Sequence, residues 1–456
     1  MINFLHLEEY RENNRIEAKK ATGGFPYSLW ETYSSFANTL GGVILLGVEE
    51  YKDTSLHAVG LPDPDKTIKT FWEGVNEKKM VSAKILTEKD VHKVVYNGKT
   101  VVAITVPRAE RVDRPVYMGS DPYTGTYRRG GEGDYRCTKQ QVAAMIKDAN
   151  RPSYDLGVLR RTRLSALDFD CVKDYRLRLD LTDGYDTTDN LTDCGLLKRI
   201  GAAGKAKDNN LHPTAAGLLC FGKRDEILKQ FPSFSLEYDD GEVTFSDKNA
   251  ETGNLYNFFF AVCERLKFIG QGKAVYDALK EALLNAVVNA NYNKFGGVRV
   301  VCTPEEIRFM NAGNLPTAPK KAFKKGVSDS RNLGVKAIFS RLGLGEGNGS
   351  GLAAIYALWR KKGWATPAFY EEFDPDSITL KLKFTAHGDN APPEREPFKA
   401  LQTALLISYL TEARLASVSE IAAALNIGED DAALAVRRLI SRKLIVADGE
   451  KFKLAR

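Results

Sequence analysis

One stretch near the N-terminus restricts the fold of this chain more than any other. Residues 28–40 carry apolar side chains at helical spacing, and Gly41-Gly42 then ends the helix. The run VILLGV that follows has no polar position, which predicts a short strand buried on both faces. The segment is therefore expected to run from a helix directly into a buried strand, and further strands are expected to follow it.

Composition and one linker suggest how the rest of the chain is divided. The 456 residues suggest roughly three domains by length, and 43% hydrophobic with 27% charged residues is an ordinary globular balance. Residues 387–397, HGDNAPPEREP, are charged and proline-rich, which predicts a linker. We therefore expect an α+β multidomain protein with folded parts at residues 1–150, 151–253, 254–386 and 398–456. Residues 151–253 show no catalytic constellation, so we interpret them as a bridging α/β region.

Several classes of protein are disfavoured by the sequence. The six cysteines are scattered without a CxxC pair, which indicates reduced thiols and argues against a zinc site or a disulfide framework. The first residues turn acidic at once, unlike a signal peptide, and the apolar runs are too short to span a bilayer. We therefore expect a cytoplasmic protein. The net charge of +6, from 65 basic and 59 acidic residues, permits nucleic acid as a partner without demonstrating it.

Acidic residues in the N-terminal part suggest a metal site. Glu12 and Glu17 lie close together, Lys19 follows, and Glu50 ends the apolar strand segment. Their carboxylates could converge on one Mg²⁺ or Mn²⁺ ion, since these ions prefer oxygen ligands. Such a metal would activate water for phosphodiester hydrolysis, and the lysine would neutralise the phosphate. A charged, solvated surface is the alternative explanation.

A family resemblance supports the metal site. The strings RENNRIEAKK, FANTLGGVILLGVEE and YRRGG resemble the Schlafen-type, Alba-like domain over about the first third of the chain. The resemblance implies that Glu12 and Glu17 are the paired carboxylates of a nuclease and that Glu50, with Glu49 as its rival, is the third. The family more often has Asp at that third position. The basic turn with Arg128 and Arg129 is a candidate phosphate contact.

A second group of polar residues suggests a nucleotide site. Glu281, Asn285 and Asn289 recur every fourth residue, which places them on one face of a helix. A helix with one solvated face would show the same pattern. Asn311 and Gly313 end a strand, and a glycine-rich stretch then precedes a helix, where backbone and helix terminus favour phosphate. Its candidate residues are Gly345, Gly347, Gly349, Ser350 and Gly351.

The order of these motifs resembles the GHKL ATPase superfamily. The resemblance implies that Glu281 is the catalytic base, Asn285 the Mg²⁺ ligand and Asn311 the adenine reader, with ATP as cofactor. It also implies that residues 347–351 form a phosphate lid. The superfamily has Asp where this chain has Asn311, and an amide accepts the adenine amino group more weakly than a carboxylate does. The string SDSRN, residues 328–332, resembles a variant that follows Schlafen-like domains in bacterial regulators.

The C-terminal part resembles a winged helix-turn-helix. Ser417 and Glu420 have capping-box spacing, and the turn Asp448-Gly449 predicts a hairpin. Leu434, Leu439 and Leu444 are candidates for the buried side of the third helix, which would enter a DNA major groove. Such domains also serve as protein-interaction modules. The candidate nucleic-acid contacts of that helix are Arg437, Arg438, Arg442 and Lys443.

These observations favour a nucleotide-controlled regulator that binds nucleic acid, most simply a transcriptional regulator. Glu12, Glu17 and Glu50 support an alternative function, a metal-dependent RNA or DNA endonuclease of defence or stress response. A scaffold in which neither site is active is the third interpretation. The expected partners are DNA or RNA and a nucleotide, and homo-oligomerisation is left open.

Overall fold

The chain forms two compact units, one of Met1–Ala149 with Ala391–Arg456 and one of Asn150–Asn390. The mixed α/β multidomain class that the sequence predicts is confirmed. No helix in the part of the chain described below is long and apolar enough to cross a membrane. The computed structural model describes residues 15–53, 55–77, 80–96, 98–130, 133–149, 153–182, 191–269, 271–316, 322–323, 329–345, 351–373, 375–385, 406–407, 409–410, 413–425, 429–441 and 444–455.

The first unit is built on a four-stranded sheet around the apolar strand that the sequence predicts. The strand order is β1-β2-β6-β5, with β1 parallel to β2 and the other pairs antiparallel. Ile44 and Leu46 pack with the helices, whereas Val43 and Leu45 join a second apolar cluster, so β2 is buried on both faces. The elements are β1 (Ile16–Lys19), α1 (Leu29–Ala37), β2 (Gly42–Leu46), α2 (Pro64–Asn76), β5 (Val91–Tyr96) and β6 (Lys99–Val106).

Two hairpins and two helices complete the N-terminal part of this unit. In the second hairpin, β7 pairs with β8 from Tyr127 opposite Arg136 to Gly130 opposite Gly133. Thr32 of α1 donates a hydrogen bond of 2.6 Å to Asp134 of β8, which ties this hairpin to the helix. The elements are β3 (Val48–Glu50), β4 (Leu56–Ala58), α3 (Pro122–Gly125), β7 (Tyr127–Gly130), β8 (Gly133–Arg136) and α4 (Lys139–Ala149).

The C-terminal segment has the capping box and the hairpin that the sequence predicts. The Ser417 backbone N–H donates to Glu420 over 2.7 Å, and the Glu420 N–H donates to Ser417 Oγ over 3.2 Å. Leu439 is buried and Leu444 is partly buried, while the side chain of Leu434 lies outside the described residues. The elements are β17 (Ala416–Ser417), α15 (Val418–Leu425), α16 (Glu429–Ser441), β18 (Ile445–Asp448) and β19 (Lys451–Leu454), with strand order β17-β19-β18.

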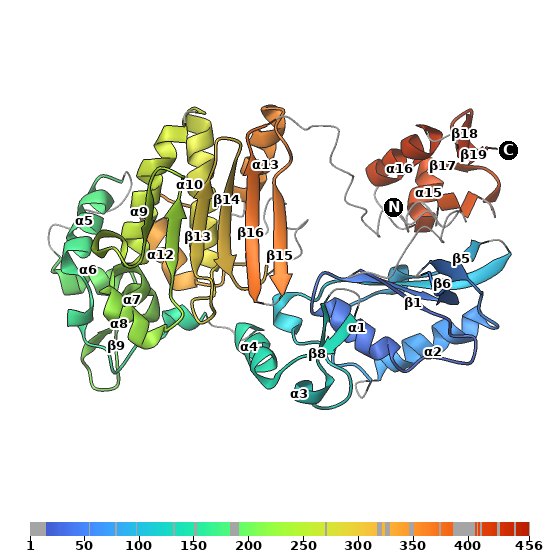
Figure 1. Ribbon diagram of the computed structural model, residues 1–456, viewed down its shortest axis with the longest axis horizontal. Helices are drawn as coiled ribbons and strands as arrows, with labels where there is room; N and C mark the ends of the chain where they lie inside the picture. The colour runs from blue at the N-terminus through green and yellow to red at the C-terminus, as the bar shows by residue number, and fades with distance from the viewer. Residues whose placement is uncertain are drawn as a thin grey trace. The chain divides into compact units, whose positions relative to one another are not determined.

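The second unit contains a six-stranded sheet that crosses the predicted boundary at residue 253. The strand order is β12-β11-β13-β14-β16-β15, so β11 of the predicted bridging region pairs with β13 of the region after it, and β12 extends the same sheet (Figure 1). The separation of residues 151–253 from 254–386 is therefore corrected, because both regions share one sheet and one hydrophobic core. The strands are β11 (Leu236–Asp239), β12 (Thr244–Ser246), β13 (Val298–Cys302), β14 (Glu306–Ala312), β15 (Ala368–Phe373) and β16 (Asp376–Lys383).

Helices cover one face of this sheet. Val300, Phe309 and Leu380 are neighbours across three strands and belong to the same core as the apolar side chains of the helices. The helices and the remaining hairpin are α5 (Phe169–Asp180), α6 (Asp193–Arg199), β9 (Ala203–Lys205), β10 (Leu211–Pro213), α7 (Ala215–Phe221), α8 (Arg224–Gln230), α9 (Leu255–Leu266), α10 (Lys273–Asn289), α12 (Leu333–Ser340) and α13 (Gly351–Lys361).

A buried carboxylate ties the start of this unit to helix α12. Asp155 is fully buried, and its Oδ2 accepts a hydrogen bond of 2.8 Å from the Val335 N–H in the first turn of α12. Ser153 also donates to the Asp155 carboxylate. The residue before α12, Asn332, makes no side-chain capping bond, so Asp155 serves as the cap from a distant part of the chain. Burial raises the pKa of the Asp155 carboxyl.

Replacing Asp155 with Ala is expected to destabilise the second unit. The Val335 N–H would lose its acceptor inside the protein, which costs about 1–3 kcal/mol. Hydrogen exchange of Leu333–Ser340 should therefore accelerate. The matched control is Asp225→Ala, which removes an exposed carboxylate of α8 in the same unit. Equal exchange in Asp155→Ala and wild type would contradict the assigned capping role.

Candidate functional site

The predicted polar stripe of the second unit lies on helix α10. Glu281, Asn285 and Asn289 are each half-buried, between the buried apolar residues of the same helix. Asn289 Nδ2 donates to Asn285, to its carbonyl oxygen over 2.9 Å and to its Oδ1 over 3.1 Å. The stripe is thus a partly buried, hydrogen-bonded row and not a fully solvated helix face.

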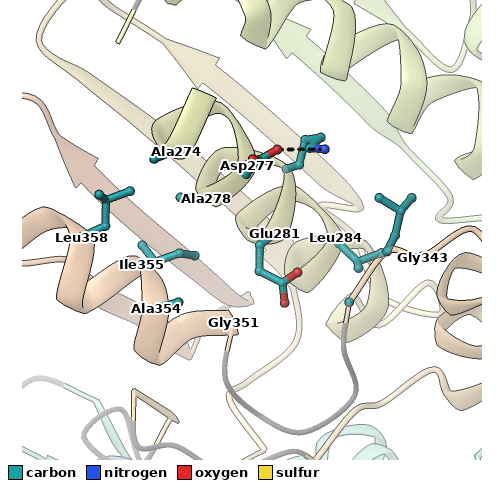
Figure 2. Close-up of a pocket in the computed structure, with 13 residues that line it drawn as sticks. Ala274, Asp277, Ala278, Glu281, Leu284, Gly343, Gly351, Ala354, Ile355 and Leu358 are labelled. Atoms are coloured by element: carbon teal, nitrogen blue, oxygen red, sulfur yellow. Dashed lines mark ion pairs between the residues drawn. The ribbon is translucent and has the colours of Figure 1, made fainter. Parts of the chain in front are cut away.

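Glu281 lies at a cavity between α10 and α13. The cavity has a volume of about 600 Å³, and Figure 2 shows the Glu281 side chain leaving α10 toward Gly351, the first residue of α13. A Cβ atom at position 351 would lie 2.0 Å from Glu281 Oε1, so a larger residue there would displace the Glu281 carboxylate. The lining residues are Ala274, Asp277, Ala278, Lys280, Glu281, Leu284, Gly343, Leu344, Gly345, Gly351, Ala354, Ile355 and Leu358.

The described wall of the cavity is mostly apolar, with three charged side chains. Lys280 pairs with Asp277 over 3.1 Å, and the Glu281 carboxylate lies in the same wall (Figure 2). Of the predicted glycine-rich residues, Gly345 and Gly351 line the cavity. Gly347, Gly349 and Ser350 lie outside the described residues.

Two predicted nucleotide contacts instead surround a buried arginine. Arg331 is 3% exposed, and its guanidinium donates to the backbone carbonyl of Asn289 and, over 2.9 Å, to that of Asn314. The Arg331 N–H also donates to Asn289 Oδ1 over 3.3 Å. Gly313 has a φ of +100°, and a Cβ there would lie 3.0 Å from Arg331 Nη1. Asn289 and Gly313 therefore make room for Arg331 and hold it in place.

Asn311 lies two residues after Phe309 on β14, so both side chains point to the helix-covered face of the sheet. Its strand neighbours are Val298 and Ile378, and the residue is 6% exposed. The side-chain Nδ2 donates to the Ala312 carbonyl over 3.3 Å, a long hydrogen bond. Neither Asn285 nor Asn311 is among the described residues that line the cavity beside Glu281.

In the first unit, Glu17 and Lys19 lie on β1 and form a buried ion-pair cluster with Arg129 of β7. Glu17 accepts from Lys19 over 2.9 Å, and Arg129 pairs with Glu17 over 2.8 Å and with Asp134 over 3.0 Å. The Arg129 side chain is 2% exposed and lies 5.3 Å from the Phe36 ring centroid. The Arg129 guanidinium therefore has its ion-pair and aromatic partners inside the domain.

This cluster changes the interpretation of the basic turn. Arg128 and Arg129 are both buried, so their side chains are not the exposed phosphate contacts that the sequence predicts. Arg129 can be buried because it pairs with two carboxylates. Burial of a guanidinium is tolerated only when its charge is paired. The correction applies to both residues.

The proposed metal ligands remain a prediction. Glu50 is exposed, and its rival Glu49 accepts a hydrogen bond of 2.9 Å from Lys20. Glu12 lies outside the described residues. Within the part of the chain that the structure describes, no three His, Cys, Asp or Glu side chains gather as a metal site.

The predicted contacts on the C-terminal helix are described only in part. Arg437 is exposed on α16, as a nucleic-acid contact would have to be. The side chain of Arg438, and Arg442 and Lys443 entirely, lie outside the described residues.

Comparison with known families gives separate matches in the first and second units. Residues 12–138 match the family described as "Schlafen, AlbA_2", the part that contains β1, β2 and the β7–β8 hairpin. Residues 296–382 match "Putative ATP-dependent DNA helicase recG C-terminal", the part that contains β13 to β16. The chain is a Schlafen-like protein. Residues 143–237 of this Schlafen-like protein match a domain of unknown function, DUF8451.

Two solved structures are similar to this Schlafen-like protein. The DIP2311 protein of Corynebacterium diphtheriae is 17% identical, with 97% of this chain and 92% of that chain covered and a TM-score of 0.42. The N-terminal domain of a "Putative ATP-dependent DNA Helicase RecG-related Protein" of Nitrosomonas europaea is 31% identical, with 30% of this chain and 95% of that chain covered and a TM-score of 0.24. No curated protein matches the chain.

Sequence patterns do not single out two residues that hold elements of the second unit together. Arg331 stands in the string SDSRN, and Asp155 stands in the predicted bridging region. A lone Arg or Asp has no spacing pattern, so periodicity gives no signal for either. Their partners, at Asn289 and Val335, are distant in sequence.

Replacing Arg129 with Met is expected to destabilise the first unit. Glu17 and Asp134 would stay buried without this cation, and breaking a buried pair costs about 3–5 kcal/mol. Hydrogen exchange of Ile16–Lys19 and Tyr127–Gly130 should accelerate, and adding Glu17→Gln should restore part of the loss. The control Lys20→Met removes an exposed pair with Glu49, worth about 0–1 kcal/mol. An unchanged unfolding free energy in Arg129→Met would show that the cluster is not stabilising.

Proposed function

We propose that this Schlafen-like protein is a nucleic-acid-binding regulator whose second unit binds ATP. The observation that carries the proposal is the cavity between α10 and α13, with Glu281 beside Gly351 at the start of a helix. Its volume of about 600 Å³ falls within the range of small-molecule sites. The match of residues 296–382 to an ATP-dependent helicase family supports the choice of nucleotide.

The residues present fit a nucleotide of the GHKL type. Gly351 begins an 11-residue helix, whose N-terminus favours an anionic group. Asn311 offers an amide oxygen to the amino group of adenine. Asn289 and Gly313 are omitted from this site because they pack around Arg331.

The same residues fit a divalent cation. Glu281 and Asn285 supply oxygen atoms, which Mg²⁺ prefers as ligands. Asn285 Oδ1 already accepts one hydrogen bond and retains a second lone pair. When bound, Mg²⁺ would neutralise phosphate charge. Glu281 would orient a water molecule and accept its proton.

For the nucleic-acid part of the proposal, two regions contribute. The AlbA_2 match of the first unit supports nucleic acid as the partner. In the C-terminal segment, α15, α16 and the β18–β19 hairpin follow the order of a winged helix-turn-helix. We assign α16 as its recognition helix, with Arg437 exposed for contact.

Nucleotide binding is tested by calorimetry of the full chain with a non-hydrolysable ATP analogue and Mg²⁺. Wild type is expected to bind, and Asn285→Ala is expected to lose the Mg²⁺-dependent part of the affinity. Glu281→Gln should bind but hydrolyse ATP about 10²–10⁴-fold more slowly, as expected when a general base is removed. Glu226→Gln, in helix α8 of the same unit, is the matched control and should resemble wild type.

Two outcomes would overturn the nucleotide assignment. One is that wild type binds no nucleotide with or without Mg²⁺. The other is that Asn285→Ala and wild type bind with the same affinity at every Mg²⁺ concentration. If ATP is bound but Glu281→Gln hydrolyses it at the wild-type rate, the role of Glu281 as the base is wrong.

A further inference from the structure

The β7–β8 hairpin presents one aromatic ring to solvent. Tyr135 of β8 is 63% exposed, although its ring rests against the backbone of the hairpin. A Cβ at Gly133 would lie 2.9 Å from the ring and a Cβ at Gly130 would lie 3.2 Å from it. Both distances are shorter than ordinary van der Waals contact, so the ring occupies space that a side chain would otherwise fill.

These two glycines are not required by the backbone. Neither Gly130 nor Gly133 has a positive φ, so other residues could adopt the same backbone conformation. Their small size instead lets the Tyr135 ring lie against them. One side of the ring is thereby held in place, while most of its surface stays open. A single exposed aromatic side chain is common on protein surfaces and implies no function. The Tyr135 ring differs because two glycines of a short hairpin hold it in a defined position.

The residues on either side of Tyr135 are held by contacts with other elements. Asp134 is bound by Arg129 over 3.0 Å and by Thr32 over 2.6 Å. Arg136 donates to the Tyr127 hydroxyl over 3.2 Å, and its guanidinium lies 5.7 Å from the Tyr127 ring centroid. Tyr135 therefore belongs to a rigid strand, so little side-chain entropy remains to be lost when a ligand packs on the ring.

The exposed residues that follow Tyr135 include two cations, which favour an anionic chain. Arg136 is exposed and leaves the opposite face of β8 toward Tyr127, and Lys139 at the start of α4 is also exposed. Proteins that bind single strands combine such cations, which attract the backbone, with aromatic rings on which bases stack. Double-stranded nucleic acid would not offer a base to this ring, because its bases are already stacked and paired.

We propose that Tyr135 is a stacking platform for an unpaired base of a single-stranded nucleic acid. The inference rests on the proposed nucleic-acid binding and adds the form of the ligand and the residue that contacts the base. Stacking tolerates any base, since every base has a π-face, so the platform selects unpaired structure and not sequence.

The test is fluorescence anisotropy of the full chain with labelled single-stranded RNA and DNA oligonucleotides and their duplexes. Tyr135→Phe should bind like wild type, because the ring is retained. Tyr135→Leu keeps an apolar cover over the glycines but has no π-face, and should bind single strands about 5- to 100-fold more weakly. Duplex binding should be the same in all three proteins. Tyr370→Ala removes a tyrosine that is 51% exposed in the second unit and is the matched control.

An abasic series separates stacking from packing. In wild type, one abasic position in the single strand should weaken binding, and in Tyr135→Leu the same position should have no further effect. If wild type binds single strands and Tyr135→Leu binds them equally well, the platform is wrong while nucleic-acid binding stands. If wild type binds no oligonucleotide, both the platform and the nucleic-acid part of the proposed function are overturned. Thermal unfolding of Tyr135→Leu at the wild-type temperature confirms that the variant is folded.

Discussion

The buried guanidinium of Arg331 joins the C-terminal end of α10 to the end of β14. It donates to the carbonyls of Asn289 and Asn314, and carbonyls at a helix C-terminus carry partial negative charge that favours a cation. With this end fixed against the sheet, the rest of the helix has a defined position. Glu281 lies two helical turns earlier, roughly 12 Å along the axis, where it meets the first residue of α13. The cavity therefore depends on the arginine at the other end of the stripe.

The first unit uses a buried arginine in a comparable way. Arg129 joins β1, β7 and β8 through Glu17 and Asp134, and its positive charge is thereby paired with carboxylates inside the domain. What the hairpin offers to the outside is the ring of Tyr135 and the cation of Arg136. In both units a buried arginine holds elements together, and only Arg129 of the two is predicted from the sequence to contact a ligand.

Features that depend on neighbouring residues could be predicted from the sequence. The buried strand β2, the helix α10 with its polar stripe, and the capping box of Ser417 and Glu420 all appear as expected, because apolar spacing and local hydrogen bonds determine them. The Schlafen resemblance was confirmed for the same reason, since its motif is a continuous string. The boundary at residue 253 failed because β11 pairs with β13 across a long connection that leaves no local signal.

The sequence by itself determined which segments become helices and strands and which family the first unit belongs to. Only the tertiary structure decided that Arg129 is buried, that Asn289 and Gly313 surround Arg331, and that Glu281 faces Gly351. The physical reason is that the identity of a polar residue does not show whether its side chain binds a ligand or stabilises the fold until its partner is known. A charge is exposed, paired or part of a binding site according to what distant segments bring beside it, and burial strengthens that dependence by removing water as the alternative partner.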